Sequence, residues 1–265
     1  MNIAVCLKQV PDTVDLRLDP ETNTLMREGV AAVLNPLDAF PLEAALRLRE
    51  ERGGGITALS MGPPAATQVL HKALAMGADH GVLLSDRAFA GSDTWATSLT
   101  LARALAMLGP FDLILCGKQA VDGDTAQVGP GIAAHLNLPQ ITCVTKVETV
   151  SQHRLRLERM FDDGTAVVEV DCPALLTVLK QANEPRLPSL AGRLRAYQAD
   201  IQVLDAAALK LDPATIGLEG SPTQVNHVSS PPGTRRQRRI QGDEAEAVRG
   251  LLDIIAEKNQ AARTQ

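Results

Sequence analysis

Short aliphatic runs alternate with helical patterns over the first half of this chain, and this alternation constrains the fold more than any other feature. It is typical of a doubly wound parallel sheet with helices on both faces, an α/β fold. Ligands of such sheets bind outside the carboxyl ends of the strands. The expected strands cover 2–7, 56–61, 81–84 and 113–116, and the expected helices follow Asn35-Pro36 and cover 63–76, 93–108 and 132–136.

Residues that favour helix ends support these boundaries. Asn35 is expected to cap the first helix, with Pro36 at its first position. The glycines at 53–55 follow that helix and precede a strand, so they indicate its C-terminal end rather than a phosphate loop. Ser92 or Asp93 is the expected cap of the helix over 93–108.

The loop after the strand at 113–116 is the most informative segment for function. It runs over 117–127, is rich in glycine, aspartate, threonine and glutamine, and precedes a helical pattern. Glycines let backbone N–H groups approach a phosphate, and a helix N-terminus adds about half a positive charge. Thr125 and Gln127 offer side-chain donors, and Lys118 offers a full charge. The order of strand, polar loop and helix start indicates an anion site, although polar loops follow strands in every α/β domain.

Composition and charge exclude several classes of protein. Aromatic residues are 2% of the chain, so Leu, Val, Ile and Ala have to build the core. A formal net charge of −5 argues against a nucleic-acid binder. No apolar run approaches the ~20 residues of a membrane span, and the N-terminus lacks the layout of a signal peptide.

The four cysteines, Cys6, Cys116, Cys143 and Cys172, lie in or beside strand-like runs and form no C-x-x-C pair. This pattern predicts buried, reduced thiols, no metal site and a cytoplasmic location. The sequence also lacks the short motifs of hydrolases, metalloproteases and P-loop proteins. We therefore assign no catalytic residue.

From residue 141 the pattern changes to strands joined by turns. Expected strands cover 141–147, 154–160, 166–170 and 174–179, followed by an extended loop over 183–190 and a short helix over 191–196. The α/β domain is expected to cover 1–215, and this hairpin-rich stretch is an addition to its parallel core.

Residues 216–265 are expected to form a linker and a helical arm. Residues 217–233 are rich in Gly, Ser and Pro, four arginines lie within 235–239, and an amphipathic helix is expected over 243–258. A linker followed by a lone helix is typical of an arm that wraps a partner. Arginines without interleaved aromatics favour an acidic partner surface over nucleic acid.

Five segments in a fixed order match one known family at corresponding intervals. They are 4–10 (AVCLKQV), Asn35-Pro36, 73–79 (ALAMGAD), 117–125 (GKQAVDGDT), and 183–186 (NEPR) followed by 188–190 (PSL). Through these segments the chain resembles the small (beta) subunit of electron transfer flavoproteins over nearly its full length.

The resemblance implies a heterodimer with a larger alpha subunit that holds a redox FAD, and a second nucleotide at the strand ends of the beta subunit. In the mitochondrial-type branch this nucleotide is AMP, with a structural role. In a second branch it is FAD, and some members use it to take hydride from NADH and bifurcate the electrons between two acceptors. Residues 123–130 resemble the FAD branch, which favours FAD with AMP as the alternative.

The resemblance also implies the residues that contact this nucleotide. Asp93, Thr94 and Thr97 match additional flavin contacts of the FAD branch, whereas capping and surface hydroxyls are the alternative roles of the two threonines. The full expected set is Cys6, Asn35, Met61, Asp93, Thr94, Thr97, Gly117, Gln119, Gly123, Asp124, Thr125, Ala126, Gln127, Val128 and Gly129. Cys6 is expected to act through its backbone.

Leu190 matches an exposed leucine by which the family docks partner dehydrogenases, within a docking loop over 183–197. The alternative is an ordinary buried leucine. An acyl-CoA dehydrogenase or another flavoenzyme is the implied partner, but the lysine-rich run of mitochondrial-type members is replaced here by 193–199, RLRAYQA. This departure leaves the identity of the partner open.

The resemblance implies an electron-carrier subunit, which would be an NADH-oxidising enzyme only as part of a bifurcating heterodimer. A nucleotide-activating or ATP-binding α/β protein, with Mg²⁺ on Asp122 or Asp124, is the less favoured alternative. Its loop would lack a lysine–serine pair, and the C-terminal arm would have no purpose.

Overall fold

The computed structural model describes residues 1–12, 32–151, 153–225, 240 and 242–263. The chain divides into two compact units, Met1–Asn226 and His227–Gln265. The first unit continues past the expected boundary at 215/216 because residues beyond it are built into its core. Ile216 is buried there, and Ser221 accepts a hydrogen bond of 2.8 Å from the Asp93 N–H.

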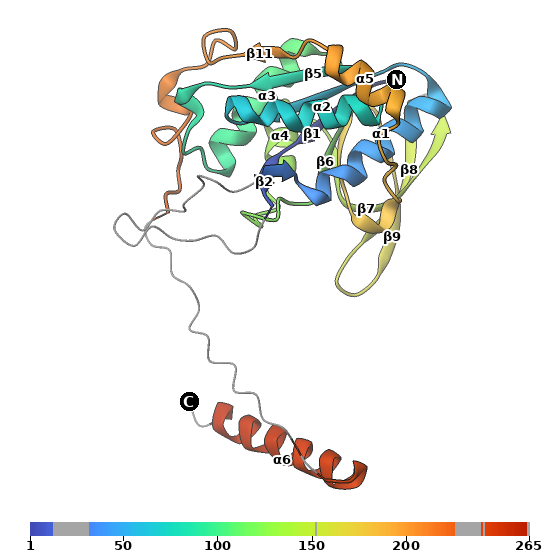
Figure 1. The fold of residues 1–265 in the computed structure, drawn as a ribbon, viewed down its shortest axis with the longest axis vertical. Coiled ribbons are helices and arrows are strands. Elements are labelled where there is room, and N and C mark those ends of the chain that lie inside the picture. Colours follow the sequence, from blue (N-terminus) through green and yellow to red (C-terminus); the bar gives the residue numbers. More distant parts are fainter. Residues whose placement is uncertain (13–31, 152, 226–239, 241, 264–265) are drawn as a thin grey trace. The chain divides into compact units, whose positions relative to one another are not determined.

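A nine-stranded sheet forms the centre of the first unit, in the order β11-β5-β4-β1-β6-β10-β7-β8-β9 (Figure 1). All neighbouring pairs from β11 to β7 are parallel, and β8 and β9 are antiparallel additions at one edge. The predicted doubly wound α/β sheet is confirmed. The strands are β1 (Asn2–Leu7), β4 (Gly55–Met61), β5 (His80–Leu84), β6 (Leu113–Gly117), β7 (Gln140–Ser151), β8 (Arg154–Met160), β9 (Thr165–Asp171), β10 (Ala174–Val178) and β11 (Gln202–Leu204).

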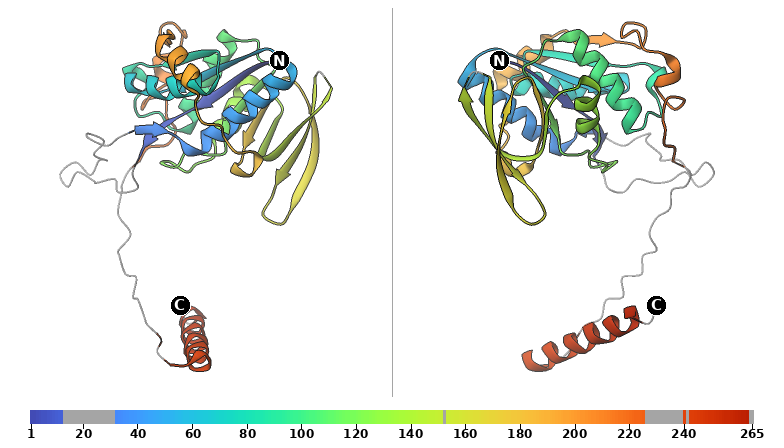
Figure 2. Two further views of the ribbon diagram at one scale, coloured as in Figure 1. Left: turned by 45° about the vertical axis from the view of Figure 1, so that its right-hand side comes forward. Right: turned by 180° about the vertical axis from the view of Figure 1, so that it is seen from behind.

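Helices cover both faces of this sheet, as the two views of Figure 2 show. On one face, α1 (Ala39–Arg52) and α2 (Thr67–Met76) share a core with Ile3, Val5 and Leu7 of β1. On the other, α3 (Thr94–Leu108) and α4 (Val128–Leu136) share a core with Ala4 and Cys6. Side chains alternate along a strand, so β1 supplies both cores.

Local capping explains two helix ends and corrects a third. Asp93 accepts hydrogen bonds from the Trp95 and Ala96 N–H groups and begins α3 as predicted. Gly53 has φ 68° and donates its N–H to the Arg49 carbonyl at 2.8 Å, which ends α1. Asn35 occupies the N-cap position of a short 3₁₀ turn, η1 (Pro36–Asp38), with Pro36 at its first position, as predicted, but its side chain makes no capping hydrogen bond. Its amide bonds instead to the loop after β6.

The hairpin-rich stretch consists of β7, β8 and β9, and β10 returns to the parallel sheet. One face of the hairpins is apolar, with Leu155 and Leu157 fully buried. The other carries cross-strand ion pairs, such as Arg154 Nε to Asp171 Oδ1 at 2.7 Å. This alternation confirms the strands expected over 154–160 and 166–170.

Several features of the fold differ from the sequence predictions. β11 is a three-residue strand beside β5, and β2 (Gln9–Pro11) pairs with β3 (Ala32–Leu34) in a separate antiparallel ladder. Neither was predicted, because three residues are too few to show a period. The helix expected from residue 132 begins four residues earlier, since a proline in the first helical turn needs no N–H partner there.

In the second unit, α6 (Glu244–Arg263) confirms the expected C-terminal helix and extends it. A short helix, α5 (Leu190–Gln198), belongs to the first unit, and the Ser189 hydroxyl accepts a hydrogen bond from the Gly192 N–H near its start. The arginines predicted to contact a partner, at 235–239, lie outside the described residues.

Candidate functional site

The carboxyl ends of the central strands β1, β4 and β6 lie side by side, at one end of the strands of the sheet. Cys6 of β1 lies opposite Leu59 of β4 and Cys116 of β6 in the parallel register. The chain order reverses here, because β4 and β6 lie on opposite sides of β1. This is the topological switch point at which open α/β sheets bind ligands. It gathers the expected site residues Cys6, Met61 and Gly117 at one edge.

A buried asparagine holds the loop that follows β6. The Asn35 amide group donates to the Gln119 carbonyl at 3.0 Å, and its side-chain oxygen accepts from the Val121 N–H at 3.3 Å. Asn35 is fully buried, so both bonds lie away from water. Asn35 therefore holds the loop 117–127 close to the end of β1. Its expected contact with a nucleotide stays a prediction.

The first turn of α3 contacts the other end of this loop. The Thr94 hydroxyl donates to the Gln127 side-chain oxygen at 2.9 Å. The second carboxylate oxygen of Asp93 accepts from the Thr223 N–H at 2.9 Å and from the Thr223 hydroxyl at 2.8 Å. Asp93 thus caps α3 and also holds Thr223 at the start of that helix. Thr97 lies half-buried in the same turn as Thr94, on the face that meets the loop residues.

The N-terminus of α4 supplies backbone donors at the end of the loop. Gln127, at the N-cap position, makes no side-chain capping hydrogen bond, and among the described residues no partner bonds the N–H groups of Val128 and Gly129. Two glycines let α4 pack closely: a Cβ on Gly129 would lie 2.8 Å from the Thr177 methyl group, and one on Gly131 would lie 2.6 Å from the Ser98 hydroxyl. The close packing fixes these donors in place.

The remaining loop residues present backbone and side chains to solvent. Gly123, Asp124 and Thr125 are exposed and Ala126 is half-buried. Asp124 and Ala126 adopt positive φ angles of 53° and 55°, a conformation that non-glycine residues adopt uncommonly. Strained backbone of this kind clusters at ligand-binding segments, where it turns successive N–H groups to one side.

A buried carboxylate beneath the loop was missed by the sequence reasoning. Asp38, in η1, is almost fully buried and accepts a hydrogen bond of 2.8 Å from the Lys8 N–H. Burial raises the pKa of Asp38 to about 7, against the opposing effect of hydrogen bonds from Lys8, Asn35 and Gly117. An acid in a first helical turn normally indicates an exposed residue, so no sequence signal marked Asp38 as buried.

Two further contacts engage the carboxylates of the loop, one an ion pair and the other a hydrogen bond from a neutral amide. The Lys8 ammonium group lies 2.7 and 2.9 Å from the two carboxylate oxygens of Asp122, and the Gln119 amide donates to Asp124. Neither pair was predicted, because each joins residues whose distance in space depends on the loop fold. Together they reduce the repulsion that an anionic ligand would meet here.

Two cysteines lie side by side at these strand ends. Cys6 and Cys116 are buried on neighbouring strands. A hydrogen bond with Cys6, together with burial, raises the pKa of the Cys116 thiol well above its usual value. The Cys116 thiol is therefore a poor nucleophile. That Cys6 contacts a nucleotide through its backbone stays a prediction.

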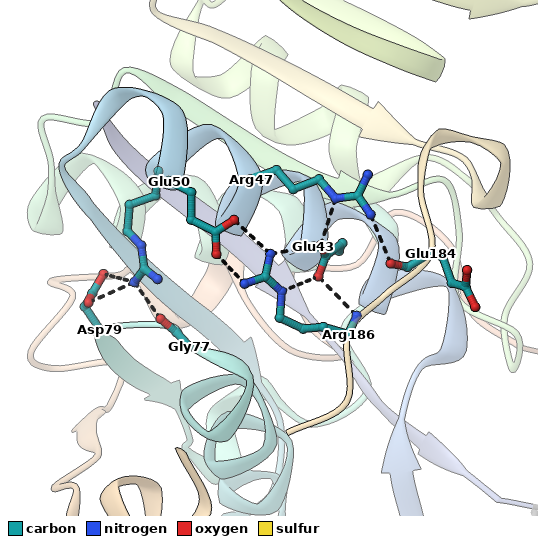
Figure 3. A network of polar contacts seen from close by, with 8 residues as sticks. Glu43, Arg47, Glu50, Gly77, Asp79, Glu184 and Arg186 are labelled. Atoms are coloured by element: carbon teal, nitrogen blue, oxygen red, sulfur yellow. Dashed lines mark hydrogen bonds and ion pairs between the residues drawn. The ribbon is translucent and has the colours of Figure 1, made fainter. Parts of the chain in front are cut away.

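The expected docking loop is held to α1 by a network of charged groups, shown in Figure 3. Arg186 donates to Glu43 and Glu50, and Arg47 bonds both to Glu43 at 2.8 Å and to the Glu184 carbonyl at 3.2 Å. Burial opposes ionisation of Glu43, but the arginine hydrogen bonds outweigh it and lower its pKa. The network fixes the segment that precedes Leu190, whose side chain is 86% exposed.

The geometry therefore fits a phosphate-bearing ligand. Backbone N–H groups at the start of α4, the positive-φ turns and a nearby lysine could hold the phosphates. One pocket among the described residues lies elsewhere, beside Arg49 and Arg195, and none of these strand ends lines it.

Comparison with known proteins decides the family. Residues 22–209 match the family profile described as "Electron transfer flavoprotein domain". A protein named electron transfer flavoprotein subunit beta, from Thermoanaerobacterium thermosaccharolyticum, is 48% identical over 256 residues, covering 96% of this chain and 98% of the relative. The chain belongs to the electron transfer flavoprotein family, as a beta subunit.

Two further relatives have other names. The subunit CarD of the caffeyl-CoA reductase-Etf complex of Acetobacterium woodii is 46% identical, over 98% of this chain and 99% of the relative. Protein FixA of Sinorhizobium fredii is 46% identical, over 97% of this chain and 92% of the relative. The resemblance seen in the five sequence segments is thereby confirmed. Within the described parts of the chain, no helix is both long and apolar enough to cross a bilayer.

Proposed function

We propose that this beta subunit binds FAD at the switch point of its sheet and, with an alpha subunit, passes electrons between flavoprotein partners. The observation that carries the proposal is the loop 117–127, held by Asn35 and Thr94 next to the uncapped N-terminus of α4. When bound, the flavin supplies the redox chemistry, and the protein supplies its position and electrostatic surroundings.

The residues of the site have distinct proposed roles toward this nucleotide. The N–H groups of Thr125 to Gly129 would hold the diphosphate, because they lie in the loop and first turn of α4. Thr94 and Thr97, on one face of α3, would contact the diphosphate or the ribityl chain. Cys6, Met61 and Gly117 would line the crevice through their backbones at the strand ends.

An exposed apolar face supports an alpha subunit as the partner. In α6, Val248, Leu251, Leu252 and Ile255 are large apolar residues that remain exposed within their own unit. Their spacing places Val248, Leu251, Leu252 and Ile255 along one side of the helix. A helix with such a face gains stability by laying it into a groove of another chain. We infer that α6 embraces the alpha subunit.

The exposed Leu190 supports a second contact, with a partner flavoenzyme such as an acyl-CoA dehydrogenase. Leu190 is the first residue of α5 and follows a loop that the hydrogen bonds of Arg186 hold to α1. Its exposed apolar side chain therefore extends from an ordered backbone. Pre-ordered loops bind with a smaller loss of conformational entropy. NADH-dependent bifurcation is the further activity that the FAD assignment would allow.

The decisive experiment is nucleotide analysis of the chain co-purified with its alpha subunit. After acid release, two equivalents of FAD per heterodimer are expected by chromatography. One FAD and one AMP would overturn the FAD assignment while leaving the nucleotide site in place. No nucleotide beyond the flavin of the alpha subunit would overturn the site itself. Rapid bleaching of the flavin absorbance by NADH would support bifurcation, and complete inertness to NADH would leave a simple carrier.

A further inference from the structure

An ion pair bridges the proposed nucleotide crevice, between the end of β1 and the loop after β6. Lys8 directly follows β1, and its ammonium group pairs with both carboxylate oxygens of Asp122, 114 positions later. The crevice of the switch point lies between these two segments. A ligand whose phosphates enter it therefore meets this ion pair.

The backbone of Lys8 is fixed independently of its side chain. Its N–H donates to Asp38 at 2.8 Å, and its carbonyl accepts from the Asn35 N–H at 2.9 Å. The side chain, by contrast, is 47% exposed, and that of Asp122 is 23% exposed. Ion pairs with this much access to water contribute little to stability. The ammonium group can therefore change partner at small cost while its Cα stays in place.

The loop does not depend on this ion pair for its conformation. Asn35 holds it at Gln119 and Val121, and Thr94 holds it at Gln127. The loop 117–127 itself carries two carboxylates and one lysine, Lys118, which is exposed. Lys8 is thus a cation from outside the loop, placed where the incoming negative charge would be.

Resting on the proposed nucleotide site, we propose that Lys8 binds the phosphates of the nucleotide and that Asp122 competes for it. Without nucleotide, the lysine pairs with Asp122. With nucleotide, its ammonium group transfers to a phosphate oxygen, and Asp122 is released to solvent. Asp122 then weakens phosphate binding, although it forms a favourable contact in this structure. If the ion pair were purely structural, Asp122 would instead support phosphate binding, because it would help to hold the site in shape.

The test compares Lys8→Gln, Asp122→Asn and Lys72→Gln in the heterodimer, after removal of bound nucleotide. Titration calorimetry measures the dissociation constants of ADP, which carries two phosphates, and adenosine, which carries none. Lys8→Gln should weaken ADP binding about tenfold, the loss expected for one charge-assisted hydrogen bond. Asp122→Asn should tighten it about threefold, because a half-exposed competing pair is worth under ~1 kcal/mol. Adenosine binding should not change.

Lys72→Gln is the matched control, as it removes an equal charge from an exposed position of α2, outside the loop 117–127, and it should leave ADP binding within about twofold. The outcomes separate the models. Weaker ADP binding in both Lys8→Gln and Asp122→Asn would overturn the competition and indicate a structural pair. Equal loss of ADP and adenosine would show that Lys8→Gln damages the site generally. Wild-type heterodimer that binds neither compound would overturn the nucleotide site itself.

Discussion

Arg186 and Glu43 form an ion pair across 143 positions of the chain, with Arg186 Nε 2.8 Å from a carboxylate oxygen of Glu43 (Figure 3). The side chain of Glu43 is only 3% exposed, so its charge depends on the arginines around it. The pair joins α1, which packs on the sheet, to the loop that leads to the exposed Leu190. It thereby connects the core of the subunit to its proposed docking segment.

Replacing Arg186 by Met should destabilise the protein by about 3 kcal/mol, because it leaves the buried charge of Glu43 with only Arg47. Urea denaturation followed by circular dichroism measures the loss. Glu50→Gln is the control: Glu50 also bonds Arg186 but is half-exposed, so its removal should cost under about 1 kcal/mol. Equal losses in the two variants would contradict the importance of burial.

Stability should respond to pH through Asp38, whose pKa is raised from 3.8 to about 7. A carboxyl group with a raised pKa binds more protons in the folded than in the unfolded protein between these values. Its contribution to the free energy of unfolding therefore decreases as the pH rises from about 4 to about 7. Lys8 and the Cys116 thiol are the titratable groups near it.

The measurement for Asp38 is the free energy of unfolding of the wild type minus that of Asp38→Asn, taken by urea denaturation at several pH values. Subtraction removes the titration of groups common to both proteins. The difference should fall across this pH window and level off above it. A difference that rises with pH would show that the hydrogen bonds from Lys8 and Gly117 outweigh burial.

Gly117→Ala should disrupt the strand end that lines the crevice. A Cβ there would collide with the Asp38 carboxylate and lie 2.9 Å from the Leu37 carbonyl oxygen. Overpacking of this kind costs about 2 kcal/mol, and nucleotide binding should weaken with it. Gly123→Ala, in the same loop, has no atom within 4 Å of the new Cβ and should leave the free energy of unfolding nearly unchanged. Calorimetric melting temperatures compare the two, and equal shifts would refute the steric explanation.

Leu190→Ala should slow electron transfer with the partner flavoenzyme without loss of stability, because an exposed side chain contributes little to folding. Stopped-flow reduction of the heterodimer by an acyl-CoA dehydrogenase and its substrate measures the rate against partner concentration. Leu187→Ala removes an equally exposed leucine three residues earlier and serves as the control. Equal rates in both variants and the wild type would argue against docking through Leu190.

The sequence alone indicated most of what positions the site. Alternating apolar runs predicted the parallel sheet and its two covered faces, and the cap at Asp93 marked the start of α3. The glycine-rich composition of 117–127 indicated the loop at the strand ends, and five ordered segments indicated the family that the comparisons confirm. These signals are local: they depend on period, capping and turn chemistry within a few residues.

Tertiary structure decided which distant residues meet. Nothing in the sequence near Asp38 or Glu43 showed that these carboxylates would be buried, and the pairing of Lys8 with Asp122 depends on the path of a whole loop. The Asn35 side chain was expected at a helix cap, but its amide donates a hydrogen bond to the carbonyl of Gln119, 84 positions away. Polar side chains have several satisfactory partners, and only packing of the complete chain selects among them.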